Sequence, residues 1–441
     1  MGEEAQKLFS GGKLIKFEGS NFDEKISTTN KYIASGESTI YEATFKFDDI
    51  LVMVDILNKG ESGWKIYEVK SASDVRNRNK SAEVKDVFIN DIAIQYYVLK
   101  GAGLDISTAS LVHINSKYVR NGPLEIDKLF SIIDLTESVV DKQNDVEEEL
   151  INIRKALSDG DPKIGIGVQC DKPYECDFKE HCWSKIPKYS VFNIAGLGDK
   201  KFDLYRLGII EVVDVPSDFP LSDNQRLQVE VEKSGREVID RKGIREFLGG
   251  LYYPLYFLDF ETFTQAIPEW DGLRPYQKIP FQYSIHYVEQ EDGELCHIEF
   301  LAMEGSDPRR TLVERLVEDI PEGTCVLAYN QSFEKGVIEE LAKQFPEYSD
   351  PLMNIHGNIL DLMAPFQKKQ YYTKEMKGRH SIKVVLPSLM PDSPYSNMEI
   401  GDGMAASNSY KGLLSKDLTE REEIKKNLKI YCKQDTQSMV D

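Results

Sequence analysis

Two short apolar runs, in different halves of the chain, each end in an aspartate, and this feature constrains the fold most. Residues 51–54 (Leu-Val-Met-Val) precede Asp55, and residues 255–258 (Leu-Tyr-Phe-Leu) precede Asp259. Such runs are typical of buried strands, and a charge at the end of a buried strand needs a partner or a metal ion. We therefore expect two sheets in a chain whose 441 residues suffice for two or three domains, at roughly 100–200 residues each.

Composition narrows the class of protein. Apolar residues make up 41% and charged residues 29%, which disfavours a disordered or fibrous chain. We expect no membrane span, because no apolar run reaches about 18 residues, and no secretory signal, because residues 1–4 lack a basic, apolar leader. Six cysteines are too few for a disulfide scaffold and favour the cytoplasm. The net charge of −20 disfavours a protein that coats nucleic acid, but not an enzyme with a local basic groove.

The order of the elements predicts an α/β architecture in both halves. In the first half, three meandering strands, a helix and a further strand are expected at 39–47, 50–57, 64–70, 88–100 and 111–114. In the second half, three strands precede alternating helices and a strand, at 255–260, 281–289, 296–302, 311–320, 325–329, 333–344 and 420–440. The expected domains are 1–186 and 251–441, joined by a helical linker at 187–250.

A first group of polar residues lies at the ends of neighbouring strands in the first half. Glu68 and Lys70 are two apart on one strand and so share a face, next to Asp55 on the preceding strand. Two carboxylates can bind Mg²⁺, and the lysine can hold a water that attacks a phosphodiester. An ordinary salt bridge near a sheet edge is the alternative. Gln95 follows on the predicted helix.

This order of strand-Asp, strand-Glu-x-Lys and helix-Gln resembles the PD-(D/E)xK nucleases of the RecB-like branch, which have a restriction-endonuclease-like fold. The resemblance implies that Asp55 and Glu68 bind metal, that Lys70 is catalytic and that Gln95 supports the site. The branch also uses an upstream acid or histidine, for which three residues qualify: Glu3, Glu4 and Glu42.

A second group of acids belongs to the other half. Asp259 and Glu261 share the face of a strand, Glu334 opens a helix, and Tyr431 and Asp435 lie four apart on the closing helix. The order Asp-x-Glu, Asn-x-x-Phe-Glu and Tyr-x-x-x-Asp resembles the tyrosine-containing DEDD exonucleases, which have an RNase H-like fold. Here Glu334 stands where that family has an aspartate.

The resemblance implies that the four acids hold two Mg²⁺ or Mn²⁺ ions about 4 Å apart, while Tyr431 orients the attacking water. We expect Asp259, Glu261, Glu334 and Asp435 to gather, with at least one raised pKa, because like charges repel without a cation. The alternative is an inactive RNase H-like domain.

Three of the six cysteines lie within thirteen residues, at Cys170, Cys176 and Cys182. Thiolates are ligands for zinc and iron–sulfur clusters. The position after the nuclease domain resembles the iron–sulfur type of RecB-like nuclease, which implies a [4Fe–4S] cluster. The fourth ligand is expected in an N-terminal segment that this chain lacks, with His181 as an alternative. Otherwise the cysteines are reduced structural thiols, and their convergence is the expected mark of a cluster.

Two further segments suit nucleic acid. Residues 196–198 (Gly-Leu-Gly) precede a helix and resemble half of a helix-hairpin-helix, although a simple packing element is equally consistent. Basic and aromatic residues alternate in 367–380, which suits a single strand by phosphate contact and base stacking, unless the segment is an ordinary surface loop. The candidates are Lys368, Lys369, Tyr371, Tyr372, Lys374, Lys377 and Arg379.

The whole chain resembles a bacterial family that joins a RecB-like nuclease domain to a DEDD-like domain. The resemblance implies a metal-dependent nuclease, with DNA favoured over RNA, single strands favoured over duplex, and exonuclease action. Two alternatives remain: a nucleic-acid-binding protein whose second domain is inactive, and an iron–sulfur interaction protein in a repair or defence complex.

Overall fold

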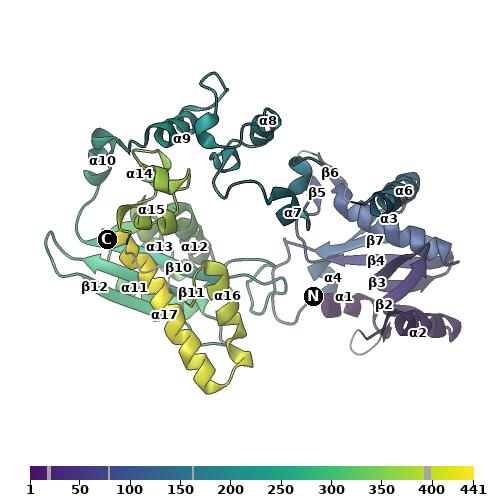
Figure 1. The fold of residues 1–441 in the computed structure, drawn as a ribbon. Helices are drawn as coiled ribbons and strands as arrows, with labels where there is room; N and C mark the ends of the chain where they lie inside the picture. The colour runs from purple at the N-terminus through teal and green to yellow at the C-terminus, as the bar shows by residue number, and fades with distance from the viewer. Residues whose placement is uncertain (17–20, 78–79, 161–162, 392–398) are drawn as a thin grey trace. The chain divides into compact units, whose positions relative to one another are not determined.

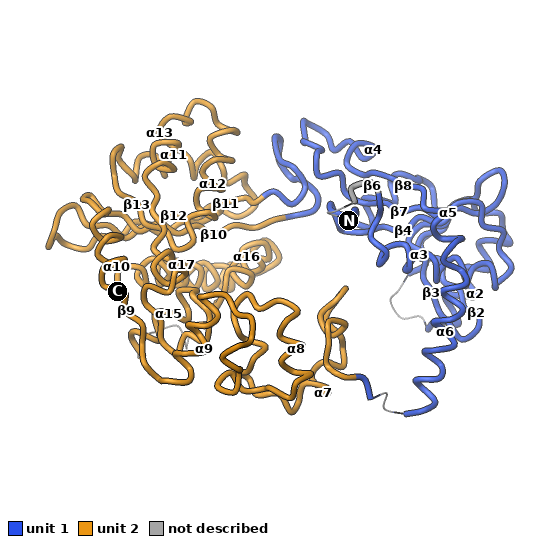
Figure 2. Tube along the Cα trace, turned by 90° about the horizontal axis from the view of Figure 1, so that it is seen from above, with its two compact units in different colours: residues 1–164, 265–277 blue, residues 165–264, 278–441 orange. Residues whose placement is uncertain are grey.

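The computed structural model describes residues 1–16, 21–77, 80–160, 163–391 and 399–441 (Figure 1). The chain forms two compact units, residues 1–164 with 265–277 and residues 165–264 with 278–441 (Figure 2). These units differ from the expected domains in two places. The cysteine segment 165–186 belongs to the second unit, and the insertion 265–277 belongs to the first. The insertion is fixed there by hydrogen bonds, since Arg120 donates to the carbonyl of Pro268 at 2.8 Å and Tyr276 donates to that of Ser71 at 2.6 Å.

The first unit is built on a mixed six-stranded sheet in the order β1-β2-β3-β4-β7-β8. Strands β2, β3 and β4 form an antiparallel meander, β7 runs parallel to β4, and β8 runs antiparallel to β7. The predicted hairpin therefore forms, although its second strand is longer than expected. The strands are β1 Lys13–Leu14, β2 Thr39–Phe47, β3 Ile50–Gly60, β4 Gly63–Lys70, β7 Ile106–Ile114 and β8 Phe130–Asp134; a separate hairpin pairs β5 Arg76–Asn77 with β6 Lys80–Val84.

Helix α3 (Asp86–Gly101) packs its apolar side chains on this sheet, where Ile92 and Leu99 join Ile66 in one buried core. The close approach of helix and sheet requires Gly101, because a Cβ there would lie 2.1 Å from the ring of Phe47. The other helices of this unit are α1 Gly2–Gln6, α2 Phe22–Ala34, α4 Ile126–Leu129, α5 Thr136–Asp141 and α6 Gln143–Ser158.

The second unit is built on a five-stranded sheet in the order β12-β11-β10-β13-β14. Strand β10 pairs antiparallel with β11 and parallel with β13, so the sheet is mixed. The strands are β10 Leu255–Phe263, β11 Ile279–Val288, β12 Cys296–Leu301, β13 Cys325–Ala328 and β14 Ile359–Asp361.

The two faces of this sheet have different partners, because side chains alternate along a strand. Tyr256, Leu258 and Phe260 of β10 pack on the apolar sides of α11 (Arg309–Asp319), α12 (Gln331–Gln344) and α13 (Ser349–Asn358). The opposite face is covered by α17 (Leu418–Val440), which Figure 1 shows in yellow. The residues of β10 that point to this face include Asp259 and Glu261. The pattern of β10 thus decides that both acids face α17.

The remaining segments of the second unit are mainly helical. The linker carries α7 Lys179–Trp183, α8 Lys200–Arg206, α9 Asp223–Ser234 and α10 Arg241–Leu248, and its strand β9 (Val238–Ile239) pairs with β15 (Tyr371–Tyr372). Between β14 and α17, the described residues also form α14 Ala364–Gln367, α15 Ile382–Leu389 and α16 Gly403–Gly412. None of the described helices is long and apolar enough to cross a bilayer. The α/β class expected from the sequence is confirmed.

Candidate carboxylate sites

Three carboxylates form a row across adjacent strands of the first unit. The β2–β3 ladder pairs Tyr41 with Ile56 and Ala43 with Val54, so that Glu42 lies opposite Asp55. Glu68 lies on β4, one residue beyond the last pair that joins β4 to β3 at this end. There the strands no longer pair by backbone bonds. The amide of Val69 donates instead to Oδ2 of Asp55 at 2.6 Å.

The candidate lysine and glutamine both contact Glu68. Lys70 Nζ lies 2.7 Å from Glu68 Oε1, and Gln95 Nε2 donates to Glu68 Oε2 at 2.7 Å. Lys70 also pairs with Asp91, which precedes Gln95 by one turn of α3. The four residues that the sequence singled out therefore lie together, with both oxygens of Glu68 already engaged.

The acids of this first site titrate in an unusual range. Burial, followed by repulsion from Glu42, raises the pKa of Asp55 to about 6, although the Val69 amide opposes the shift. Burial and repulsion from Asp55 raise the pKa of Glu68 to about 7, against the effect of Lys70. Burial alone would lower the pKa of Lys70, but Glu68 and Asp91 outweigh it and hold the pKa above its usual value. The site thus carries a cation of its own.

The three upstream acids that the sequence left open have different positions. Glu42 adopts a positive φ of 58° within β2, and its pKa is raised by burial and by repulsion from Glu68. Glu3 and Glu42 line a cavity of about 660 Å³ next to the strands, together with Lys25 of α2. Glu4 pairs with Lys7 at 2.6 Å. Glu42 is thus the candidate acid whose charge acts on Asp55 and Glu68.

In the second unit, Asp259, Glu261 and Asp435 each offer a carboxylate oxygen within 4.8 Å of the others, a grouping suited to a metal ion. The two β10 acids are two apart and share a face, and α17 brings Asp435 against them. The helix is docked on β11 by polar contacts. Gln282 donates to the carbonyl of Leu428 at 2.9 Å, and Ser284 bonds to Thr436 at 2.7 Å.

Glu334 lies in the first turn of α12 and is only 2% exposed. Its Oε2 has no hydrogen-bond partner among the described atoms. Glu334 is not one of the three acids within 4.8 Å, but its charge acts on both Asp259 and Glu261. A buried carboxylate oxygen without a donor is costly, and a divalent cation would satisfy it. The donor set therefore fits Mg²⁺ or Mn²⁺.

Tyr431 is buried one helical turn from Asp435, and its hydroxyl accepts a hydrogen bond from Lys383 Nζ at 3.1 Å. Lys383, on α15, also donates to the carbonyl of Gly401 at 2.6 Å. Burial and the nearby carboxylates, with Asp435 first, raise the pKa of Tyr431 above its usual value, so the phenol stays protonated. Lys383 therefore fixes the hydroxyl beside the carboxylates.

The site in the second unit has a larger excess of negative charge than the site in the first unit. Burial and Asp435 raise the pKa of Glu261 to about 8, against the opposing effect of Lys383. Burial and Asp361 likewise raise the pKa of Glu334 to about 8. The pKa of Asp259 lies well above its usual value, because of burial and repulsion from Asp435. The raised pKa that the sequence led us to expect is confirmed for three carboxyls.

The three clustered cysteines do not form a tight group. Cys170 is buried, Cys176 is partly buried and Cys182 is exposed. In a tetrahedral zinc site, Zn–S bonds of about 2.3 Å bring the sulfurs to about 3.8 Å from one another. In the described part of the chain, the sulfur atoms of the three cysteines do not all lie within 4.8 Å of one another. Cys170 instead packs with Phe202 and Ile166. The thiols are thus not gathered around a single zinc ion, and the [4Fe–4S] cluster, whose larger size separates its cysteine sulfurs further, stays a prediction.

The basic and aromatic segment divides into exposed and buried residues. Lys369 and Tyr372 are 7% and 2% exposed, and Nζ of Lys369 lies 4.0 Å from the centroid of the Tyr372 ring. Burial lowers the pKa of this lysine to about 8. Both side chains belong to the interior and cannot contact a strand on the surface, so the expectation was wrong for them. Tyr371 is partly buried, and the exposed members are Lys368, Lys374, Lys377 and Arg379.

The Gly-x-Gly turn of the linker serves packing in this structure. Gly196 and Gly198 adopt φ values of +67° and +60°, and between them Leu197 enters a small core with Ile194 and Leu204. Helix α8, which follows, has seven residues. These features match the packing element that was the alternative reading.

Several residues around both sites were missed in the sequence. Asp91 could have been found, because it lies one helical turn before Gln95 on the same face. Lys383, Asp361 and Asp402 carry no local signal, since their relation to the acids arises only when α15 packs on α17, β14 pairs with β13, and α16 packs on β10. Asp402 adds to the repulsion on Glu261.

The two units are thus α/β structures that each hold a cluster of buried carboxylates beside a lysine. Residues 256–381 match the family described as "Domain of unknown function (DUF2779)". The matched stretch includes Asp259, Glu261 and Glu334 and ends before Tyr431 and Asp435. A comparison with curated proteins finds no match.

Proposed function

We propose that this protein is a metal-dependent nuclease whose second unit hydrolyses phosphodiester bonds with an RNase H-like, DEDD-type site. The observation that carries the proposal is the grouping of Asp259, Glu261 and Asp435 within 4.8 Å, with the unpartnered oxygen of Glu334 nearby. Structural acids are normally paired with bases, whereas these buried acids repel one another. A cation is the simplest remedy for such repulsion.

The roles of the side chains follow from their chemistry. Asp259, Glu261, Glu334 and Asp435 would hold Mg²⁺ or Mn²⁺, which supplies an activated water and stabilises the leaving oxygen. Tyr431, fixed by Lys383, presents a protonated hydroxyl that can orient the attacking water. Cys432 Sγ lies 3.8 Å from Asp259 Oδ2 and can hold that carboxylate in place.

The first unit is proposed as a second nuclease site of the PD-(D/E)xK type. Asp55 and Glu68, with Glu42 opposite, would supply oxygen ligands, and Lys70 would hold the water. Its support is the contact of Lys70 and Gln95 with the same carboxylate. Single-stranded DNA is the proposed substrate of both sites.

The decisive test is release of nucleotides from a labelled single-stranded oligonucleotide, with and without Mn²⁺, by the wild type, Lys70→Ala, Asp259→Asn and the double variant. Each single variant should remove part of the activity, and the double variant should remove all of it. Activity that persists in the double variant, or that does not depend on metal, would refute the proposal. An RNA strand of the same sequence tests the preference for DNA.

A second candidate is a nucleic-acid-binding protein whose second unit is inactive. It is favoured by the position of Glu334 outside the group of three acids. In that case the wild type should bind Mn²⁺ and a single strand, but Asp259→Asn should not change the rate of cleavage.

An iron–sulfur role for Cys170, Cys176 and Cys182 is a separate proposal, supported by their sequence spacing alone. Anaerobic purification with iron and sulfide tests it. A brown protein with an absorption band that Cys176→Ser abolishes is the expected result, and a colourless wild type would exclude it.

A further inference from the structure

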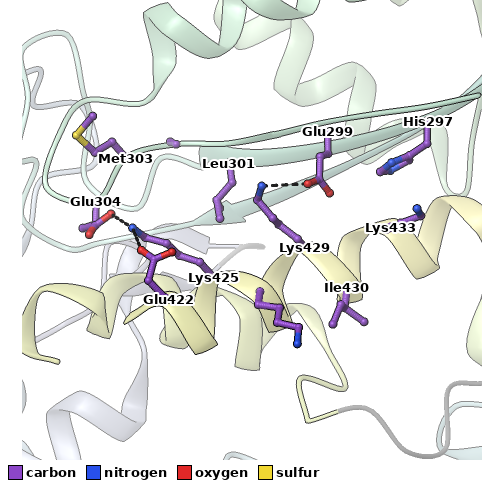
Figure 3. Close-up of a pocket in the computed structure, with 12 residues that line it drawn as sticks. His297, Glu299, Leu301, Met303, Glu304, Glu422, Lys425, Lys429, Ile430 and Lys433 are labelled. Carbon is purple, nitrogen blue, oxygen red and sulfur yellow. Dashed lines mark hydrogen bonds and ion pairs between the residues drawn. The ribbon is translucent and has the colours of Figure 1, made fainter. Parts of the chain in front are cut away.

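A groove on the far side of α17 from the carboxylates has a composition that the proposed catalytic sites do not explain. It has a volume of about 840 Å³ and lies between α17 and β12, the edge strand of the five-stranded sheet (Figure 3). Residues 424–434 contain four lysines and no acid, although the chain has a net charge of −20. Lys425, Lys429 and Lys433 follow one another at four-residue steps, so they share one face of the helix.

These lysines are arranged to receive a chain of negative charges. At a rise of 1.5 Å per residue, four-residue steps place them about 6 Å apart along the helix, comparable with the spacing of successive phosphates along an extended strand. Both walls also provide exposed apolar surface, because Met303 beyond β12 is 74% exposed and Ile430 of α17 is 49% exposed. Phosphate contact with the lysines is the electrostatic part of single-strand binding, and Met303 and Ile430 offer apolar contact to sugars and bases.

The two ion pairs across the groove differ in how exposed they are. Lys425 pairs with Glu304 and Lys429 with Glu299, each at 3.0 Å. The second pair is exposed, with 47% and 31% of the side chains accessible. Exposed pairs contribute about 0–1 kcal/mol, so a phosphate can take Lys429 from Glu299 at little cost.

Lys433 and His297 line one end of the groove (Figure 3). The pKa of His297 is lowered by burial and by Lys433, against the effect of Glu299. His286 behind it has a pKa of about 4, owing to burial, His297 and Lys433. Lys433 is thus the cation at this end of the groove, while both imidazoles stay neutral.

We propose that the groove between α17 and β12 binds the sugar-phosphate backbone of a single-stranded nucleic acid, with Lys429 and Lys433 as its main phosphate contacts. The inference deepens the proposed nuclease function and rests on it for the identity of the substrate. Strands β10 and β12 are two positions apart in the sheet, about 10 Å, and α17 lies between the groove and the carboxylates, so a nucleic-acid strand that contacts both must pass around this helix.

The test is the affinity of the full chain for a fluorescent single-stranded oligodeoxynucleotide in EDTA, measured by anisotropy over a range of salt concentrations. Lys429→Ala/Lys433→Ala should weaken binding about tenfold and reduce the salt slope by about 1.4, since each phosphate contact on a single strand contributes about 0.7. Lys411→Ala/Lys416→Ala changes the net charge equally at exposed positions outside the groove, and should weaken binding less than about twofold.

A second readout is independent of net charge. In the wild type, the imidazole NMR signals of His297 should shift when the oligonucleotide is added, and this shift should be lost in Lys429→Ala/Lys433→Ala. Equal weakening by the two double variants, or an unperturbed His297, would overturn the groove proposal. Metal binding at Asp259 is measured separately, so the proposed nuclease function can fail while the groove binds, or the reverse.

Discussion

The carboxylate clusters of the two units differ in how their negative charge is balanced. In the first unit, Glu68 is held by Lys70 and Gln95, and Asp55 accepts a backbone hydrogen bond. In the second unit, Asp259, Glu261 and Asp435 face one another, and Lys383 lowers the pKa of Glu261 without cancelling the shift. A site with its own cation can fold without metal at small cost. In the second site, the carboxylates repel one another until a metal ion binds. Metal should therefore stabilise the second unit more.

The largest expected effect is that of Asp259→Asn on the second site. The substitution keeps the shape of the side chain but removes a ligand, so exonuclease activity from this unit should be abolished. In the wild type, Mn²⁺ at a hundredfold excess over its Kd should add about 2.7 kcal/mol to the free energy of unfolding. Thermal unfolding should show this shift shrinking in the variant. Asp292→Asn is the control, since Asp292 is exposed at a φ of 55° that asparagine tolerates. An equal loss of activity and of the Mn²⁺-induced shift in this variant would contradict the proposed difference between the two sites.

Lys70→Ala tests the balance of the first site. It leaves Glu68 and Asp91 without their cation, which should lower the free energy of unfolding without metal by about 1.5–3 kcal/mol. The cleavage that survives Asp259→Asn should also disappear. Urea denaturation and oligonucleotide cleavage measure the two effects. Lys70→Arg retains the charge and should recover most of the stability, and a neutral result for Lys70→Ala would mean that the first site is not balanced by this lysine.

Lys383→Met should have a smaller effect, with opposite signs in two assays. Removal of the positive charge near Glu261 should strengthen Mn²⁺ binding several-fold, because the ion no longer competes with the lysine. Cleavage by the second unit should fall, because the Tyr431 hydroxyl loses its donor. Isothermal titration and kinetic assays separate the two. Lys383→Arg should stay near the wild type, and weaker metal binding in Lys383→Met would show that the lysine has only a structural role.

The smallest effect is expected for Gln95→Ala, which removes the neutral hydrogen-bond donor to Glu68. The loss should be about 1 kcal/mol in the free energy of unfolding, and Mn²⁺ should restore little of it because Lys70 remains. Urea denaturation with and without metal measures this. A loss as large as that of Lys70→Ala would indicate that hydrogen bonding, rather than charge, balances the first site.

Much of the fold could be predicted because strands and helices have distinct apolar periods. The strand of Asp259, the hairpin of β2 and β3 and the helix α3 all form near their expected bounds. The burial of Lys369 and Tyr372 could not be predicted, because the same alternation of basic and aromatic residues is compatible with an exposed segment and with a buried one. The burial of Cys170 likewise depends on the apolar core that encloses it.

The sequence by itself determined which residues share a face within one element: Asp259 with Glu261, Glu68 with Lys70, and Tyr431 with Asp435. The reason is that the period of two in a strand and of 3.6 in a helix follows from backbone geometry alone. Only the tertiary structure decided that Glu42 lies opposite Asp55 and that Lys383 holds Tyr431. Those contacts join distant segments, and they depend on how whole elements pack, which no local pattern encodes.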